Sequence, residues 1–179
     1  MNNLAFNRFG AGAFLFAASG ISIAIIGTVA MLTHEPWVFP SLGPTAFILF
    51  AAPLGAQASP RNVISGHLIG IAAGALSLAL FGLLSIAPDL EDVSLERISA
   101  VTLALALTLS VMVWLGVPHA PAGATTLIVA LGLLRTPKDF AVMMLAVIAL
   151  VIIGAVINRV AGQRTPWWNP VTTDPGSAS

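Results

Sequence analysis

Three histidines are the side chains of this chain whose ordinary pKa lies nearest to neutral pH, and each lies near a break in an apolar segment: His34, His67 and His119. A histidine at membrane depth could carry a proton, or it could stay neutral and bridge helices by hydrogen bonds. The spacing of the three fits no recognised metal-binding pattern, and the chain has no cysteine. We therefore expect no metal site and no cofactor.

Glycine, proline and hydroxyl residues interrupt two apolar segments in matching ways. Residues 40–46 read PSLGPTA and residues 120–126 read APAGATT, so aligning the two glycines also aligns two threonines. A helix that begins at such a break has unpaired N–H groups and the positive end of its dipole. Two such starts near the membrane midplane would bind a small anion, with hydroxyls as further donors. Alternatively, glycine and proline only permit close packing. The candidate binding residues are Ser41, Gly43, Thr45, Gly123, Thr125 and Thr126.

Four residues beside these breaks complete the predicted substrate site: Arg61, Asn62, His67 and His119. Arg61 could bind an anion, or its charge could extend to the lipid headgroups. We expect Ser41 to cap the helix that follows it. No Asp or Glu lies within an apolar segment, so no carboxylate pair is available for catalysis, and we expect no enzymatic activity.

The composition indicates an integral membrane protein. Of the 179 residues, 58% are hydrophobic and only 8% are charged, whereas soluble domains carry about 25% charged residues. These values exclude an ordinary soluble enzyme, a nucleic-acid-binding protein and a disordered chain. The net charge is zero, so no polybasic arm is expected.

Six apolar segments define the expected fold. Two of them, 41–55 and 121–134, would span about 22 Å and 21 Å as helices, less than the hydrocarbon core of about 30 Å. Each half of the chain has the order long, short, long, which is the pattern of a transporter built from repeats. We predict an all-α transmembrane bundle with four full spans plus two short broken or re-entrant helices, arranged as two structural repeats. The segments are 11–33, 41–55, 62–86, 98–117, 121–134 and 140–157.

The expected organisation is an N-terminal segment (1–10), one transmembrane domain (11–162, with repeat halves 11–86 and 98–162) and a C-terminal coil (163–179). The positive-inside rule does not choose between six and four crossings. Six crossings place Arg61 on the inside and four place Arg97 there, each with Arg8, Arg159 and Arg164. We favour six crossings. Both arrangements put the two termini on one side, expected to be the cytoplasm of a bacterial inner membrane.

Gly66, Gly70 and Gly74 recur every four residues in the third apolar segment. Such a ladder lets a second backbone approach closely, so we predict a packing seam with an internal helix or with another subunit. A bundle this small could hardly enclose a wide site alone, and we expect a homo-oligomer.

Four motifs in this order resemble the HPP family of integral membrane proteins: residues 34–37 (HEPW), 40–46 (PSLGPTA), 60–67 (PRNVISGH) and 119–125 (HAPAGAT). The similarity covers about residues 11–160. The His-Pro-Pro of the family name is here His119-Ala120-Pro121, which puts any role of the middle proline in doubt. The resemblance implies four spans and, from chloroplast and cyanobacterial members, nitrite transport. We therefore expect transport of a small monovalent anion, nitrite first, with lipids as the other partner. The alternative is a structural or sensory membrane subunit.

Overall fold

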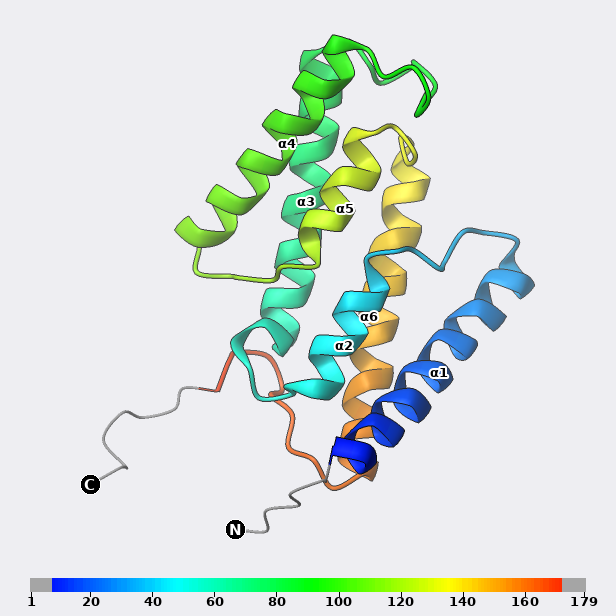
Figure 1. Ribbon diagram of the computed structural model, residues 1–179, viewed down its shortest axis with the longest axis vertical. Coiled ribbons are helices and arrows are strands. Elements are labelled where there is room, and N and C mark those ends of the chain that lie inside the picture. Colours follow the sequence, from blue (N-terminus) through cyan, green and yellow to red (C-terminus); the bar gives the residue numbers. More distant parts are fainter. Residues whose placement is uncertain (1–7, 172–179) are drawn as a thin grey trace.

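The computed structural model describes residues 8–171, and within this range the regular structure is entirely helical (Figure 1). The all-α prediction is confirmed. A short 3-10 turn, Ala56–Ala58, lies between the second and third α-helices. The α-helices are α1 (Arg8–Thr33), α2 (Leu42–Ala51), α3 (Pro60–Leu80), α4 (Leu95–Trp114), α5 (Ala122–Ala130) and α6 (Pro137–Val160).

Four of these helices, α1, α3, α4 and α6, are long and apolar enough to cross a membrane. The other two are short, with 10 residues in α2 and 9 in α5. A non-helical stretch leads into each short helix, and both begin inside the bundle and run in opposite directions (Figure 1). Four full spans with two broken segments are therefore what the chain forms.

The two halves of the chain form interlocked, inverted repeats. Successive helices alternate in direction, so that α1–α3 and α4–α6 run in opposite senses (Figure 1). The short helix α2 packs on α1 and on α6, and α5 packs on α4 and on α3. Each short helix therefore packs against the last helix of the other half. The last helices also begin alike, with a hydroxyl cap followed by proline at the first position (Ser59-Pro60 and Thr136-Pro137).

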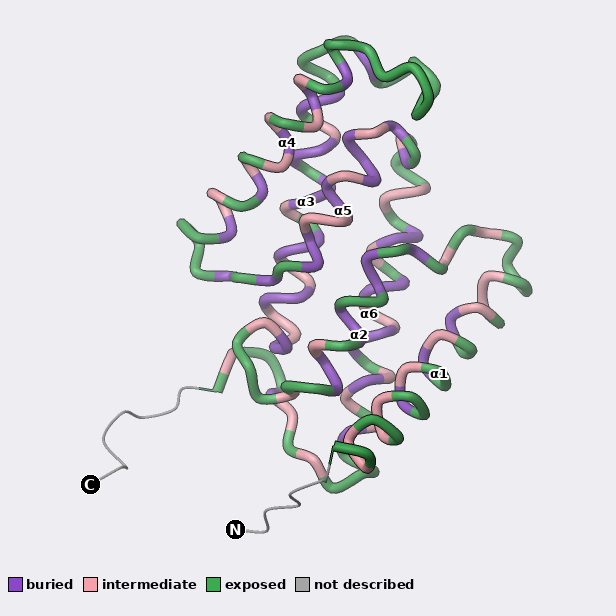
Figure 2. The backbone as a smooth tube through the Cα atoms, viewed as in Figure 1, coloured by how far each residue is buried: buried purple, intermediate pink, exposed green. Residues whose placement is uncertain are grey.

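The glycine ladder on α3 packs against α5, as predicted for a close seam. A Cβ atom on Gly70 would lie 2.8 Å from the carbonyl oxygen of Ala122 and 2.8 Å from Oγ1 of Thr126. A Cβ on Gly74 would lie 2.8 Å from Val129. The partner is thus an internal helix. Figure 2 shows buried positions gathered on α3 and α5 and on α2 and α6, whereas only 17% of the apolar window of α1 is buried.

Charged side chains separate between the two ends of the bundle. We call the end where α1 and α3 begin and α6 ends the Arg8 end (Figure 1). By the helix bounds, its described charges are Arg8, Arg61 and Arg159, in the terminal turns of these helices, and Arg164, which follows α6. The opposite end, called the Asp89 end, carries Arg97, Arg135 and Lys138 with the described acidic residues Glu35, Asp89, Glu91, Asp92, Glu96 and Asp139.

This distribution of charges is the one expected for six crossings, because Arg61 lies at the same end as Arg8. One contact at each end of the bundle joins segments that this arrangement places side by side. The backbone N–H of Arg61 donates to the carbonyl of Trp168 at 3.1 Å, and Lys138 pairs with Glu35 at 2.5 Å. The first contact also shows that part of the predicted C-terminal coil packs on the bundle. Residues 1–7 and 172–179 of the predicted terminal segments lie outside the described residues.

Candidate functional site

His67 lies at the point where the first turns of the two short helices meet. Its side chain projects from α3 and is fully buried. Its Nδ1 lies 2.7 Å from Oγ1 of Thr125 on α5, and its Nε2 lies 3.1 Å from Oγ1 of Thr45 on α2. The two threonines, which the repeat alignment placed at equivalent positions, are therefore bridged by one imidazole.

His119 joins the same cluster from the turn before α5. Its Nε2 lies 3.2 Å from Nε2 of His67 and 3.3 Å from Oγ1 of Thr45. Its Nδ1 lies 2.8 Å from the carbonyl oxygen of Gln57, whose side-chain oxygen accepts a second bond from the N–H of Ala120 at 2.8 Å. Both histidines and both threonines are completely buried. We call these four residues the histidine–threonine cluster.

Donors and acceptors in this cluster match in one neutral arrangement. The Gln57 carbonyl can only accept, so Nδ1 of His119 carries its proton and Nε2 has a lone pair. The Thr45 hydroxyl donates to the carbonyl four residues earlier at 2.8 Å, so it accepts from Nε2–H of His67. That same N–H faces Nε2 of His119, and the Thr125 hydroxyl donates to Nδ1 of His67. With both rings neutral, every polar side-chain atom of the cluster is hydrogen-bonded.

The backbone at the two helix starts is less available than the sequence suggested. On α5, the N–H groups of Ala122, Gly123 and Ala124 donate to carbonyls of the preceding turn at 3.0, 3.0 and 3.1 Å. On α2, the N–H groups of residues 42 and 43 are also paired. The expected cap is wrong, because the Ser41 hydroxyl makes no capping bond and is buried without a partner. Donors for a ligand would therefore come from side chains.

Thr126 belongs to a second polar contact. Its hydroxyl donates to the carbonyl of Ala122 at 3.0 Å and lies 2.8 Å from Oγ1 of Thr108 on α4. Both side chains are fully buried. Sequence reasoning missed Thr108 and Gln57. Thr108 is an isolated hydroxyl in an apolar helix, and Gln57 lies in the turn beyond the apolar segment, so neither carried a motif.

The other predicted site residues make their contacts elsewhere. Nη2 of Arg61 approaches the carbonyl of Leu115 at 3.5 Å near the Arg8 end. Nδ2 of Asn62 donates to the carbonyl of Ala56 at 2.9 Å. Gly43 is exposed, and Gly123 is half-buried against α4. None of these four residues is hydrogen-bonded to the histidine–threonine cluster.

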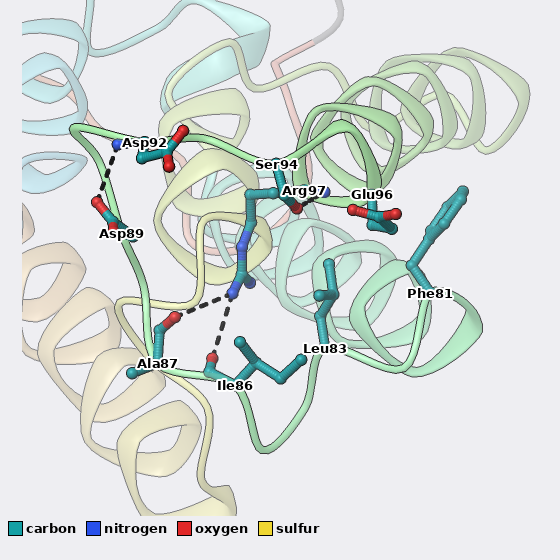
Figure 3. Close-up of a pocket in the computed structure, with 9 residues that line it drawn as sticks. All are labelled: Phe81, Leu83, Ile86, Ala87, Asp89, Asp92, Ser94, Glu96 and Arg97. Carbon is teal, nitrogen blue, oxygen red and sulfur yellow. Dashed lines mark hydrogen bonds between the residues drawn. The ribbon is translucent and has the colours of Figure 1, made fainter.

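A separate cavity of about 390 Å³ lies at the Asp89 end, around Arg97 (Figure 3). Arg97 is only 3% exposed, and its Nη2 donates to the carbonyls of Ile86 and Ala87 at 3.2 and 3.4 Å. Its Nη1 lies beside Gly132 and has no hydrogen-bond partner. The buried guanidinium thus ties the loop between α3 and α4 to the first turns of α4 and packs beside the turn after α5.

The sequence of this chain is similar to a known protein family and to a curated relative. The family model described as the HPP transmembrane region matches residues 7–166. A transmembrane protein of Dictyostelium discoideum is 26% identical over 135 residues, which are 72% of this chain and 44% of that protein. The chain thus spans less than half the length of this relative, and no solved structure matches it. From the family match over most of its length, the chain belongs to the HPP family and is a multi-pass integral membrane protein.

Proposed function

We propose that this protein transports a small monovalent anion, with nitrite as the first candidate, through the histidine–threonine cluster. The observation that carries the proposal is the meeting of two broken helices at His67, in the interior of the bundle. Discontinuous helices at equivalent positions of inverted repeats are the usual location of a transporter binding site. Nitrite follows from the family resemblance, and nitrate or formate would satisfy the same physical argument.

The neutral state of the cluster favours an anion that arrives with a proton. No cation contacts the cluster among the described residues, and a bare anion at membrane depth is costly without a counter-charge. A proton bound at Nε2 of His119 would turn an acceptor into a donor. The N–H groups of His67 and His119 would then point toward each other, and an oxyanion between them would accept from both.

Binding in this way requires the two rings to separate. Their Nε2 atoms lie 3.2 Å apart, whereas two hydrogen bonds to one shared oxygen need about 5 Å between the nitrogens. In this proposal the structure corresponds to the closed form of the site. Because Thr45 and Thr125 are on oppositely directed helices, a small shift of either helix would open one side of the cluster.

The test is nitrite uptake into proteoliposomes that contain the purified protein. Thr45→Val combined with Thr125→Val keeps side-chain shape and removes both hydroxyls, and each substitution is expected to slow uptake about tenfold. Thr28→Val is the matched control, because the Thr28 hydroxyl likewise donates to the carbonyl four residues earlier but lies on exposed α1. Uptake by the double variant at the parental rate would place the site elsewhere.

The proton's role is tested by His119→Gln and by His67→Gln, each between about pH 5.5 and 8. Glutamine keeps hydrogen bonding but cannot carry a proton, so the pH dependence of uptake should flatten in the His119 variant, which lacks the protonated nitrogen, and in the His67 variant, which lacks its partner. A parental pH profile in the His119 variant would contradict the proton's role there, and one in the His67 variant would make His67 a structural histidine. If the parent moves neither nitrite, nitrate nor formate faster than empty liposomes at any pH, the structural or sensory role replaces transport.

We also propose that both termini are cytoplasmic in a bacterial inner membrane, since Arg8, Arg61, Arg159 and Arg164 share one end. The homo-oligomer stays a prediction, and native mass spectrometry in detergent would test it. The expectation that the protein is not an enzyme likewise stays part of this proposal.

A further inference from the structure

An apolar groove runs along the outer surface between α3 and α6 near the Arg8 end. Its volume is about 310 Å³, and its lining includes Ile64 of α3, Ile152 and Val156 of α6, and Trp167 and Trp168 of the following segment. Ile152 is 58% exposed and Val156 is 55% exposed, so the groove opens outward from the bundle. Its walls suit a hydrocarbon chain.

A second cavity adjoins the groove through Arg159, which lines both, and its wall includes the apolar Leu54 and Val171. This cavity has a volume of about 470 Å³ and is also lined by Gln163, Arg164 and Thr165. The Arg159 guanidinium stacks on the Trp167 ring, 3.7 Å from its centroid. Neither the Arg159 nor the Arg164 guanidinium forms an ion pair or a hydrogen bond within residues 8–171. The Thr165 hydroxyl is buried without a hydrogen-bond partner.

From these two adjoining spaces we infer a binding site for one anionic phospholipid. The lipid phosphate would accept hydrogen bonds from Arg159, Arg164 and Thr165, and one acyl chain would lie in the groove between α3 and α6. Basic pockets between transmembrane helices are suited to anionic headgroups, and Trp and Arg are common at this depth. Planar guanidinium donors also match phosphate geometry.

A second copy of the chain fits this surface poorly. In one membrane, neighbouring copies lie in the same orientation, so the Arg8 end of one meets the Arg8 end of the next. The described acidic residues all lie at the Asp89 end. A neighbouring copy would thus bring arginines toward Arg159 and Arg164, whereas a lipid phosphate neutralises them.

The experiment measures quenching of Trp167 and Trp168 by brominated lipids in nanodiscs that contain the full protein. Trp37→Phe and Trp114→Phe remove the other two tryptophans of the chain. Brominated phosphatidylglycerol in a phosphatidylcholine background should quench at a lower mole fraction than brominated phosphatidylcholine. Arg164→Gln, which leaves the Trp167 stack untouched, should raise the half-quenching mole fraction about fivefold, and adding Arg159→Gln should raise it about 25-fold.

Two controls distinguish a specific lipid site from a general electrostatic attraction between arginines and anionic lipids. Arg8→Gln removes the same charge from the same end but outside both cavities, and it should leave quenching unchanged. Ala155→Phe, which fills the groove, should weaken quenching while both arginines remain.

Four outcomes would overturn the inference. They are equal quenching by the two lipids, unchanged preference in the arginine double variant, an Arg8→Gln effect as large as that of Arg164→Gln, and quenching by neither lipid, which would indicate a protein cover. Inorganic phosphate in excess should not displace the lipid. Displacement would be a fifth outcome against the inference and would assign the cavity around Arg164 to free phosphate.

Discussion

The close seam between α3 and α5 makes Gly70→Ala a sharp test of the packing. The added Cβ would lie 2.8 Å from the Ala122 carbonyl oxygen, 2.8 Å from Oγ1 of Thr126 and 3.4 Å from the Thr126 nitrogen. Ordinary contacts of this kind exceed 3.4 Å, and two of the three atoms belong to the backbone. A rotamer change therefore cannot relieve the clash, and α5 must move away by roughly half an ångström.

The expected loss of stability follows from three contributions. Overpacking typically costs about 1–3 kcal/mol, and replacing helical glycine by alanine returns about 0.5–1 kcal/mol. Moving α5 also stretches the 2.7 Å bond between His67 and Thr125, which contributes up to about 1 kcal/mol. The net prediction is a decrease of about 2 kcal/mol in the free energy of unfolding, within limits of about 0 and 3.5 kcal/mol.

Thermal unfolding in detergent, followed by tryptophan fluorescence, measures this change. Gly20→Ala on α1 is the matched control, because nothing lies within 4 Å of a Cβ there. The control should be neutral or more stable by up to about 1 kcal/mol. If the Gly70 and Gly20 variants unfold at the same temperature, the seam does not limit the approach of α3 and α5, and the reasoning is refuted.

Three further predictions concern the helix ends and the Asp89 end. Thr136→Ala removes the capping box at the start of α6 and should lower the free energy of unfolding by about 0.5–2 kcal/mol, measured by the same thermal assay. Arg97→Met leaves the carbonyls of Ile86 and Ala87 without their donor and should speed proteolysis of the loop between α3 and α4, while unchanged cleavage would contradict the anchoring role. Two backbone N–H groups donate to the Asp89 carboxylate and hold its pKa below the ordinary 3.8. These loop contacts should therefore be complete above pH 3.8 and be lost as the pH falls through the lowered pKa. Amide hydrogen exchange measured against pH would show this loss, and loosening of the loop already above about pH 5 would contradict it.

Local composition was enough to predict the elements of this fold. Long apolar runs without charge form helices in lipid, because every backbone group must be hydrogen-bonded there. The breaks at residues 40–46 and 120–126 could be predicted because proline and glycine change the backbone conformation at their own positions. The Gly70 seam was predictable for the same reason, since a missing side chain permits close approach whatever the partner.

The composition of the histidine–threonine cluster was only partly predictable. Thr45, Thr125, His67 and His119 stood out as polar residues near breaks, and the structure brings them together. Gln57 could not be predicted, because its carbonyl accepts a hydrogen bond from His119, which is far away in the sequence. Free N–H groups at the helix starts were expected from helix geometry alone, but tight turns before α5 already pair them.

The sequence by itself determined the membrane location, the number and approximate bounds of the helices and the resemblance between the two halves, since each depends on residues close together in the chain. Only the tertiary structure decided that each short helix packs on the last helix of the other half and that Arg61 shares an end with Arg8. Partner choice depends on the fit of whole surfaces. The glycine face of α3 admits α5 closely along three glycines, whereas α6 contacts α2 with a single glycine, Gly154, whose Cβ would lie 3.3 Å from Leu49. No local pattern contains that comparison.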